Sequence, residues 1–353
     1  DEWYATGFGA VLKALGNNNL SWEKTDKFNV GIEMQFLNRR LTVDADYYHD
    51  KTIDVVNDVS LSQTSGFSSY KDNMGEVLNQ GFELQVRGEV LRNRDWLVAL
   101  WGNMAHNKNK IMKISDSQRA YNQRVKDFYQ KAINEQAYSS YDPQYGVPIA
   151  QYEEGQSLTS IWAVKSLGID PTTGKEIFLN RDGSVSDTWN ATQEVVVGNT
   201  EPKFNGSVGF NVAYKAWSLF AAFQYEWGGQ EYNQTLVDRV ENARIQYQNV
   251  DLRVLTDRWK KPGDIAQFKD IKDADYVTMP TSRFVQDKAY LRLSALTLSY
   301  DFNREWIKKH LGMNMLRLEA STRDFINWNS IRQERGLSYP KSWTVDFSIK
   351  AQF

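Results

Sequence analysis

The stretch SWTVDFSIKAQF, residues 342–353, closes the chain and decides its fold class. Its alternate residues are apolar, namely Trp343, Val345, Phe347, Ile349, Ala351 and Phe353. The residues between them are polar. This alternation predicts a β-strand with one apolar and one polar face. What decides the fold is whether protein or lipid covers the apolar face.

The same alternation recurs along the chain. It predicts nine long strands, over residues 24–37, 40–56, 74–90, 95–107, 203–214, 216–228, 288–302, 315–327 and 342–353. The phase of the pattern shifts between Leu293 and Leu296, which predicts a β-bulge there. The sequence therefore predicts an all-β protein.

The connections between these strands alternate in length. Short links are expected at 37–40, 91–95, 215–217 and 303–312, and long ones at 57–73, 108–202, 229–287 and 328–341. All short links would lie at one end of an antiparallel sheet. Outer-membrane barrels sort their connections in this way, with short periplasmic turns and long extracellular loops. A soluble sandwich has no physical reason to do so.

The long connections carry their own structure. Apolar spacing predicts helices over 117–136 and 232–246. Residues 160–180 are expected to form a hairpin that turns at Asp170–Gly174.

Aromatic residues bracket the predicted strands. Trp343 and Phe353 lie ten residues apart on one face, and Trp217 and Trp227 repeat the interval. Ten residues span ~33 Å along a strand, which a tilt of ~40° reduces to roughly 25 Å, the height of the apolar band of an outer-membrane barrel. Trp and Tyr favour the two membrane interfaces. We therefore expect the apolar face to meet lipid.

Composition excludes several other classes. The net charge is −2 and no Lys/Arg-rich block occurs, so no nucleic-acid role is expected. The chain has no cysteine and no apolar run near the ~20 residues of a membrane helix. His49, His106 and His310 are isolated, and no calcium-loop spacing is present. No enzyme activity, metal or cofactor is predicted.

Nine strands are an odd number, whereas bacterial single-chain barrels have even numbers and must close in lipid. We therefore expect further strands upstream of this chain.

Six motifs follow one another along the chain. The first two are NNNLSWEKTDKFNVGIEMQFLNRRLTVDADYYHDKTIDVV (17–56) and NMGEVLNQGFELQVRGEV (73–90). The others are GIDPTTGKEIFLNRDGSV (168–185), GNTEPKFNGSVGF (198–210), RWKKPGD (258–264) and SRFVQDKAYLRLSALTLSYDF (282–302). In this order they resemble the SusC/RagA-type TonB-dependent receptors, and the resemblance covers nearly the whole chain.

This resemblance implies a transmembrane antiparallel β-barrel of 22 strands in the outer membrane of a Gram-negative bacterium of the Bacteroidota. Residues 1–353 would be its C-terminal nine or so strands, with short helices in the extracellular loops and with the plug and N-terminal strands outside this chain. The resemblance implies import of oligosaccharides, or of peptides as in the RagA branch. A SusD-like surface lipoprotein would be the lid and TonB would supply the energy. Dimers of such receptor–lid pairs are left open.

Candidate ligand contacts are the inward polar residues expected near the extracellular rim: Tyr48, Asp50, Glu226 and Arg323. Loop aromatics such as Trp189, Tyr232 and Tyr247 are further candidates, because an aromatic face suits a sugar ring. They are weaker candidates than the inward rim residues. The resemblance gives the terminal Phe353 a role in recognition by the barrel-assembly machinery. The alternatives are a soluble β-sheet module that binds or hydrolyses glycans, and a passive porin, which needs neither lid nor plug.

Overall fold

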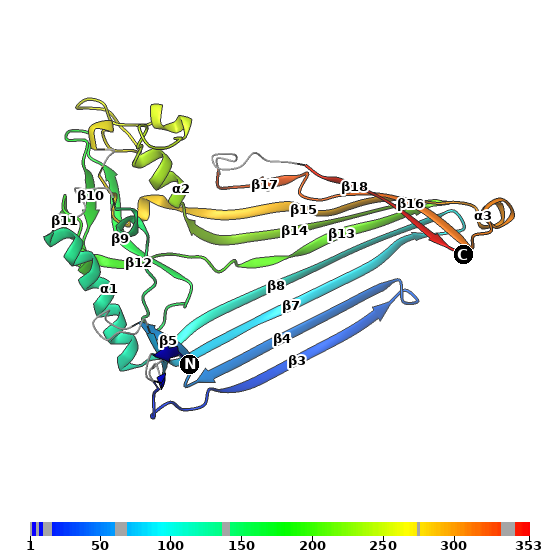
Figure 1. Cartoon of the computed structure of the whole chain (residues 1–353), viewed down its shortest axis with the longest axis horizontal. Helices are drawn as coiled ribbons and strands as arrows, with labels where there is room; N and C mark the ends of the chain where they lie inside the picture. Colours follow the sequence, from blue (N-terminus) through cyan, green and yellow to red (C-terminus); the bar gives the residue numbers. More distant parts are fainter. Residues whose placement is uncertain are drawn as a thin grey trace.

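The computed structural model describes residues 2–4, 7–9, 16–60, 69–135, 142–273, 276–332 and 343–353. Within these ranges nine long strands pair in one antiparallel sheet, here called the main sheet (Figure 1). In spatial order they are β18 (Val345–Gln352), β16 (Met315–Thr322), β15 (Val285–Asp301), β14 (Trp217–Tyr232), β13 (Phe204–Tyr214), β8 (Trp96–Ile114), β7 (Gly75–Arg92), β4 (Leu41–Ile53) and β3 (Lys24–Phe36). The predicted strands are confirmed.

Several strand ends differ from the prediction. β8 continues to Ile114 and β14 to Tyr232, because their pairing with β7 and β15 extends into residues that were assigned to loops, where the apolar alternation fades. β16 stops at Thr322, since Asp324 has a left-handed backbone (φ 57°), and a short strand, β17 (Asn327–Asn329), resumes the pairing with β15. Residue 342, the predicted start of the last strand, lies outside the described residues.

The predicted β-bulge is confirmed. The pairing of β14 with β15 passes from Ala222 opposite Ala295 to Phe223 opposite Leu293, which leaves Ser294 without a partner in the ladder. The Ser294 hydroxyl donates a hydrogen bond to the Ala222 carbonyl at 2.9 Å. An extra residue of this kind changes the phase of the side chains without ending the strand.

The short and long connections lie at opposite ends of the main sheet (Figure 1). We call these the short-turn end and the long-loop end. At the short-turn end, helix α3 (Arg304–Leu311) joins β15 to β16. The Asn303 side chain caps it by accepting hydrogen bonds from two backbone N–H groups, and Gly312 ends it with a left-handed conformation (φ 69°).

The long-loop end is folded, and it carries the remaining elements. Two small hairpins are β1 (Glu2–Tyr4) with β2 (Gly7–Gly9), and β5 (Val56–Ser60) with β6 (Ser69–Asn73). A four-stranded sheet pairs β11 (Val185–Ser186), β10 (Glu176–Leu179), β9 (Ser160–Ile169) and β12 (Glu194–Asn199). Helices are α1 (Asp116–Asn134), α2 (Gln234–Leu236) and the π-helical turn Val237–Glu241, and 3₁₀ turns are Pro143–Gly146, Ala191–Gln193, Leu252–Leu255, Ile271–Asp273 and Ser282–Phe284.

Two of the three loop predictions are confirmed. α1 matches the predicted helix, and Ser115 caps its start. β9 and β10 form the expected hairpin, closed by a hydrogen bond from the Gly174 N–H to the Asp170 carbonyl. The helix predicted over 232–246 was too long, because Tyr232 still belongs to β14 and the helical turns end at Glu241.

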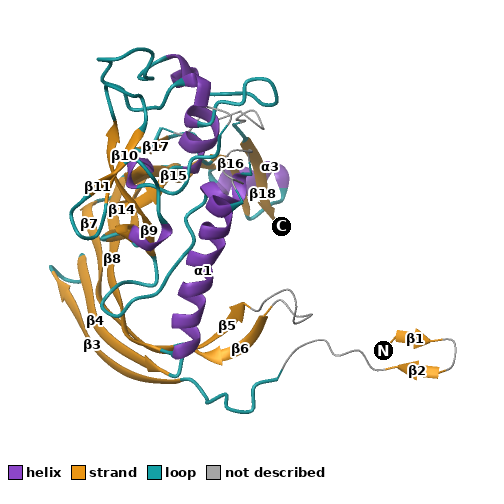
Figure 2. Cartoon of the chain, turned by 90° about the vertical axis from the view of Figure 1, so that its left-hand side faces the viewer, coloured by secondary structure: helices purple, strands orange, loops and turns teal. Residues whose placement is uncertain are grey.

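The hydrophobic clusters found among the described residues lie in the long loops. The largest joins α1 residues such as Val125 and Tyr129 to Trp189 and Met279, and the others lie within residues 236–284. The apolar face of the main sheet, by contrast, is exposed, with Phe347 at 82% and Phe28 at 57%. The main sheet is curved, and α1 lies over its concave side (Figure 2). No other layer of the described chain covers its apolar face.

Aromatic side chains form two rows across the apolar face. Cross-strand pairing aligns one row at the short-turn end, made of Trp96, Tyr214, Trp217 and Tyr300. A second row at the long-loop end contains Phe82, His106, Phe204 and Trp227. On β14 the rows are ten residues apart, as Trp217 and Trp227 show, which again corresponds to ~33 Å along the strand. Two such rows are typical of the two interfaces of a membrane.

No helix among the described residues is both long and apolar enough to cross a membrane.

Candidate functional site

A polar network lies where β4, β7 and β8 reach the long-loop end. The Tyr48 hydroxyl donates to Asn107 Oδ1 at 2.9 Å, and the Asn107 amide donates in turn to the Glu201 carboxylate. The Asn109 backbone N–H donates to the other Glu201 oxygen at 3.1 Å. Gly81 makes room for Tyr48, because a Cβ at residue 81 would lie 2.6 Å from the tyrosine hydroxyl. We call Tyr48, Asn107, Asn109 and Glu201 the rim network.

The rim network also holds a loop segment. Asn109 Oδ1 accepts hydrogen bonds from the Leu158 N–H at 2.8 Å and from the Ser157 hydroxyl at 3.3 Å. The Asn109 amide group donates to Asn79 on β7 at 2.7 Å. Asn109 therefore joins β7 and β8 of the main sheet to residues 157–158, which lead into β9.

A cavity of about 830 Å³ lies beside this network. Its lining is rich in amide and carboxylate side chains: Asn107, Asn109, Gln156, Asn199, Glu201, Gln230 and Asp287. Such groups donate and accept hydrogen bonds in directions that suit hydroxyl groups. Pockets of this size with convergent polar groups are where small ligands bind.

The four predicted contact residues are distributed unevenly. Tyr48 belongs to the rim network, and Asp50 lies two residues further along β4, opposite Asn79. Glu226 on β14 is 3.7 Å from the ammonium group of Lys288, a residue that lines the cavity. Arg323 lies apart, exposed in the break between β16 and β17 and deeper in the main sheet than the rim.

Sequence reasoning missed Asn107, Asn109 and Glu201. The signal was present in HNKNK (106–110), an uninterrupted polar run, but the predicted strand ended at residue 107, so Asn109 and Glu201 were placed in a loop and Asn107 was not singled out. Where both faces of a strand are polar, apolar and polar residues no longer alternate. The alternation that predicts strands therefore cannot locate the end of such a strand.

The histidines do not converge. His49 lies on β4, opposite Phe28, and His310 lies in α3, where its ring stacks on Trp306. The His106 ring lies between Phe82 and Phe204, with centroid distances of 5.4 and 5.5 Å. His106 is thus part of the aromatic row and not of the rim network.

The loop aromatics have different surroundings. Trp189 is buried in the largest loop cluster, and its indole N–H donates to the Pro280 carbonyl at 2.9 Å. Tyr232 packs against Phe284 in the second cluster. Tyr247 is exposed, with the Arg244 guanidinium 4.5 Å from its ring centroid. Trp189 and Tyr232 therefore stabilise the loops.

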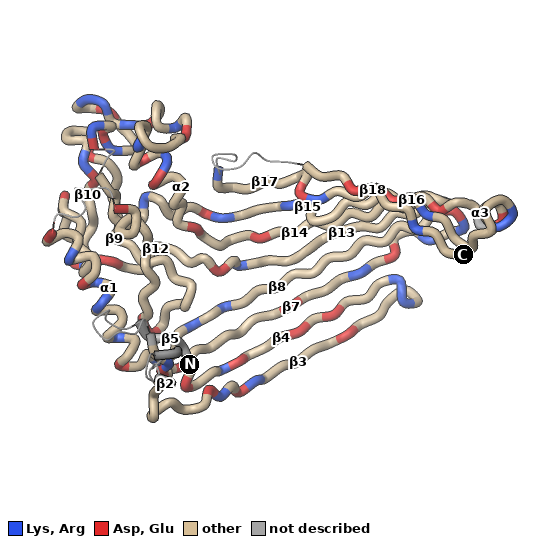
Figure 3. The backbone as a smooth tube through the Cα atoms, viewed as in Figure 1, with Lys and Arg blue, Asp and Glu red and all other residues tan. Residues whose placement is uncertain are grey.

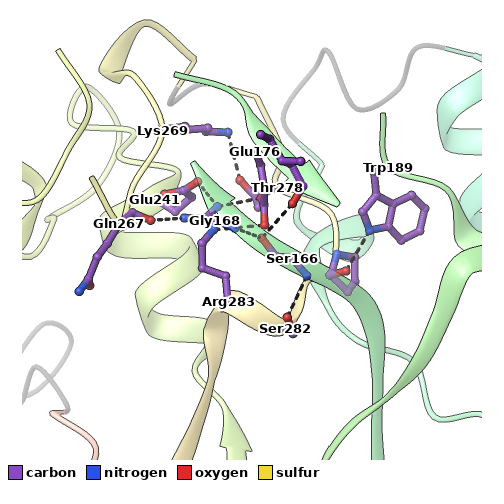
Figure 4. A network of polar contacts seen from close by, with 12 residues as sticks. Ser166, Gly168, Glu176, Trp189, Glu241, Gln267, Lys269, Thr278, Ser282 and Arg283 are labelled. Carbon is purple, nitrogen blue, oxygen red and sulfur yellow. Dashed lines mark hydrogen bonds and ion pairs between the residues drawn. The ribbon is translucent and has the colours of Figure 1, made fainter. Parts of the chain in front are cut away.

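A buried ion-pair cluster fastens the loop segments to one another (Figure 4). Arg283 lies 2.6 Å from Glu241 and 2.9 Å from Glu176, and it also donates to the Gln267 carbonyl. Burial alone would raise the pKa of Glu241, but the Arg283 guanidinium outweighs it and holds that pKa below its ordinary value. Lys269 lies nearby, bonded to Thr278, and burial lowers the pKa of its ammonium group.

A second buried acid, Glu194 on β12, has no ion-pair partner of this kind. It accepts a hydrogen bond from Gln151 at 2.5 Å, and its other oxygen has no hydrogen-bond partner among the described residues. Burial raises the pKa of Glu194 to about 7, although the Gln151 hydrogen bond and the charges of Lys126 and Arg181 oppose the shift. Glu194 is therefore protonated in the folded loops at mildly acidic pH.

This carboxyl predicts a pH-dependent stability of the loops. The folded state keeps the proton up to about pH 7, while the unfolded chain releases it near pH 4.5. Stability is then complete below pH 4.5 and falls by about 3 kcal/mol as the pH rises to 7. Hydrogen exchange of residues 160–199, measured between pH 5 and 8 and corrected for intrinsic rates, checks this. Glu194→Gln should remove the dependence, and an unchanged pH profile in that variant would refute the assignment.

Comparison with known proteins agrees with this architecture. Residues 1–321 match the family model described as TonB dependent receptor-like, beta-barrel. TonB-dependent receptor P3 of Formosa agariphila is 26% identical over 91% of this chain and 31% of its own length. SusC of Bacteroides thetaiotaomicron, a TonB-dependent receptor, is 24% identical over 87% of this chain and 28% of its own length.

A solved structure gives the same fold. The RagAB peptide transporter superposes on the whole of this chain with a TM-score of 0.76 and 21% identity, over 38% of that protein's chain. This chain spans about a third of the length of the curated relatives that it matches. The chain is similar to SusC and to the RagAB transporter, and it belongs to the TonB-dependent receptor-like β-barrel family, whose barrels lie in the outer membrane.

Proposed function

We propose that this chain forms part of an importer that carries oligosaccharides across the outer membrane, driven by TonB and covered by a SusD-like lipoprotein lid. In this proposal residues 1–353 are the C-terminal part of the barrel, and the plug and remaining strands belong to other parts of the protein. The chain itself performs no chemistry on its ligand. The observation that carries the proposal is the cavity beside the rim network, with its amide and carboxylate side chains, in a chain that is related to SusC over most of its length.

The cavity supports a glycan more than a peptide. A sugar presents many hydroxyl groups and no net charge, and the lining offers amides, carboxylates and the hydroxyl groups of Ser157 and Ser160. The lining also contains three lysines and two carboxylates, and one of the lysines, Lys288, lies 3.7 and 3.3 Å from Glu226 and Glu231. We propose Tyr48, Asp50 and Glu226 as ligand contacts at this level, with Arg323 as a contact further along the lumen.

Growth of a deletion strain tests the substrate class. Removing the gene is expected to abolish growth on at least one polysaccharide in a panel of purified glycans, because large oligosaccharides do not pass passive pores. Growth on casein peptides should stay unchanged, and complementation should restore the lost growth. Lost growth on peptides with full growth on every glycan would refute the glycan proposal and favour peptide import.

An exposed apolar surface at the long-loop end suits the proposed lid. Leu252, Leu255 and Ile265 are 72%, 68% and 95% exposed, and a hollow of about 660 Å³ lies between Ile245, Leu255 and Ile271. Contiguous apolar surface on loops typically marks a protein interface.

Charge in that surface should weaken lid binding. Leu255→Glu is expected to lower the yield of a SusD-like lipoprotein, identified by mass spectrometry, that co-purifies with the receptor from outer membranes by at least tenfold. Val185→Glu, at an apolar residue of similar exposure in a different loop, is the matched control. Equal yields from wild type, Leu255→Glu and Val185→Glu would contradict this placement.

A further inference from the structure

Basic residues gather at the short-turn end of the main sheet, among fewer acidic ones (Figure 3). They come from three turns and from helix α3, and all are exposed: Arg39, Arg40, Arg92, Arg94, Lys215, Lys308 and Lys309. The acidic residues at the same end are Glu89, Asp95, Asp301 and Glu305, and Asp301 is paired with Arg317 at 2.6 Å. Since the whole chain carries a net charge of only −2, this excess of positive charge is local to one end.

These basic residues lie next to the aromatic row at the short-turn end and to exposed apolar side chains. Lys215 follows Tyr214 directly, and its ammonium group lies 5.2 Å from that tyrosine ring. Trp306 and Leu311 flank the α3 lysines and are half exposed, while Ile307 is buried. The positive charges therefore lie where the apolar band of the barrel ends, which is the level of lipid headgroups.

The turn between β3 and β4 and the end of β7 form a hollow at this level. Arg39, Arg40 and Arg92 line a space of about 1060 Å³ together with Leu37, Leu41 and Val90. Glu89 lies 3.2 Å from Arg92 and neutralises one of the three guanidinium groups, and Asn38 and Gly88 complete the lining. Guanidinium groups beside aliphatic side chains match a phosphate joined to a hydrocarbon chain.

The backbone of this turn is strained. Leu37, Asn38 and Arg39 have consecutive φ angles of 52°, 55° and 66°, in the left-handed region that non-glycine residues occupy only at an energetic cost. Leu37 is nevertheless 73% exposed. Contact with lipid would bury this apolar side chain and so offset the backbone strain.

We propose that the short-turn end binds anionic phospholipid headgroups, and that the hollow between residues 37–41 and 88–92 is the principal site. The phosphate accepts hydrogen bonds from Arg39, Arg40 and Arg92, and the first part of an acyl chain lies against Leu37 and Val90. Short turns of outer-membrane barrels face the periplasm, so the leaflet concerned is the inner one. This site lies at the opposite end of the sheet from the rim network and is independent of the imported ligand.

Lipid retention on the purified receptor tests the proposal. The protein is taken from outer membranes into detergent, equilibrated with equal amounts of phosphatidylglycerol and phosphatidylcholine, and analysed by native mass spectrometry. Wild type should retain phosphatidylglycerol preferentially. The triple variant Arg39→Gln, Arg40→Gln, Arg92→Gln should lose at least tenfold of that preference, because each basic group near a headgroup contributes a factor of about five.

The matched control removes the same charge at the other end. Lys110→Gln, Lys113→Gln, Arg119→Gln changes three exposed basic residues of the long-loop end and should leave retention as in wild type. If the first triple variant fails to fold, the wild type in 0.5 M salt replaces it, and its preference should fall strongly. Competition with inorganic phosphate and with lipid A distinguishes the source of the phosphate.

The proposal is overturned if phosphatidylcholine is retained equally well, if both triple variants lose retention to the same degree, or if salt has no effect. Displacement by inorganic phosphate at equal concentration would likewise overturn it, since a free ion would then be sufficient. Displacement by lipid A and not by phosphatidylglycerol would show that the surface binds lipid A, which contradicts a phospholipid site in the inner leaflet.

Discussion

Phe347→Arg is expected to destabilise the barrel in a bilayer by about 2–4 kcal/mol. Phe347 lies on β18 between Trp343 and Phe353, near the middle of the apolar band, and its side chain is 82% exposed from the protein. A guanidinium at this depth must lose its water or deform the bilayer. Denaturant unfolding of the receptor refolded into phosphatidylcholine vesicles, followed by tryptophan fluorescence, measures the difference.

Ser348→Arg is the matched control for this substitution. Ser348 is the next residue of β18 and lies on the opposite face, paired with Glu319 of β16. The same positive charge there should cost less than 1 kcal/mol, because it meets water and a carboxylate. Equal losses of stability in both variants would mean that the two faces of β18 meet the same medium, which contradicts a lipid-facing strand.

Arg283→Met is expected to destabilise the folded loops by about 3–5 kcal/mol, since it leaves the carboxylates of Glu241 and Glu176 buried without their cation. Both acids are held by the same guanidinium, at 2.6 and 2.9 Å, and the Glu241 side chain is fully buried. The main sheet has no part in this cluster. Hydrogen exchange should therefore become fast in the loop residues 160–199 and 234–284, while β13 and residues 217–227 of β14 stay protected.

Arg119→Met is a suitable comparison. Arg119 on α1 also faces an acid, Asp116, but the two are 3.8 Å apart and both are exposed. An exposed pair of this kind contributes under about 1 kcal/mol, so exchange should be close to that of wild type. Arg283→Met with wild-type protection of the loops would show that the buried cluster does not hold them together.

The main sheet could be predicted from the sequence because its physical signal is local. Each strand must alternate to face lipid on one side, so FNVGIEMQF and FELQVRGEV identify β3 and β7 without knowledge of their neighbours. The bulge at Ser294 was visible for the same reason, as a change of phase between Leu293 and Leu296. Strand ends were less accurate where alternation fades, as at Ile114 and Tyr232.

The candidate site could be predicted only in part. Tyr48 was identified from its inward position on β4, but its partners Asn107 and Glu201 are 59 and 153 residues away, and no local pattern pairs them. The same holds for Arg283, whose partners Glu176 and Glu241 lie 107 and 42 residues away in the chain. Such contacts depend on how the long loops fold back over the rim, which is a tertiary effect.

The alternating faces of β18 can be measured directly. The chain has no cysteine, so single cysteines at positions 345–350 can each carry a nitroxide label. In vesicles, labels replacing Val345, Phe347 and Ile349 should collide frequently with oxygen and rarely with a water-soluble nickel chelate. Labels replacing Asp346, Ser348 and Lys350 should show the reverse. If the first three labels are instead shielded from both reagents, protein and not lipid covers the apolar face, and the membrane-barrel account is wrong.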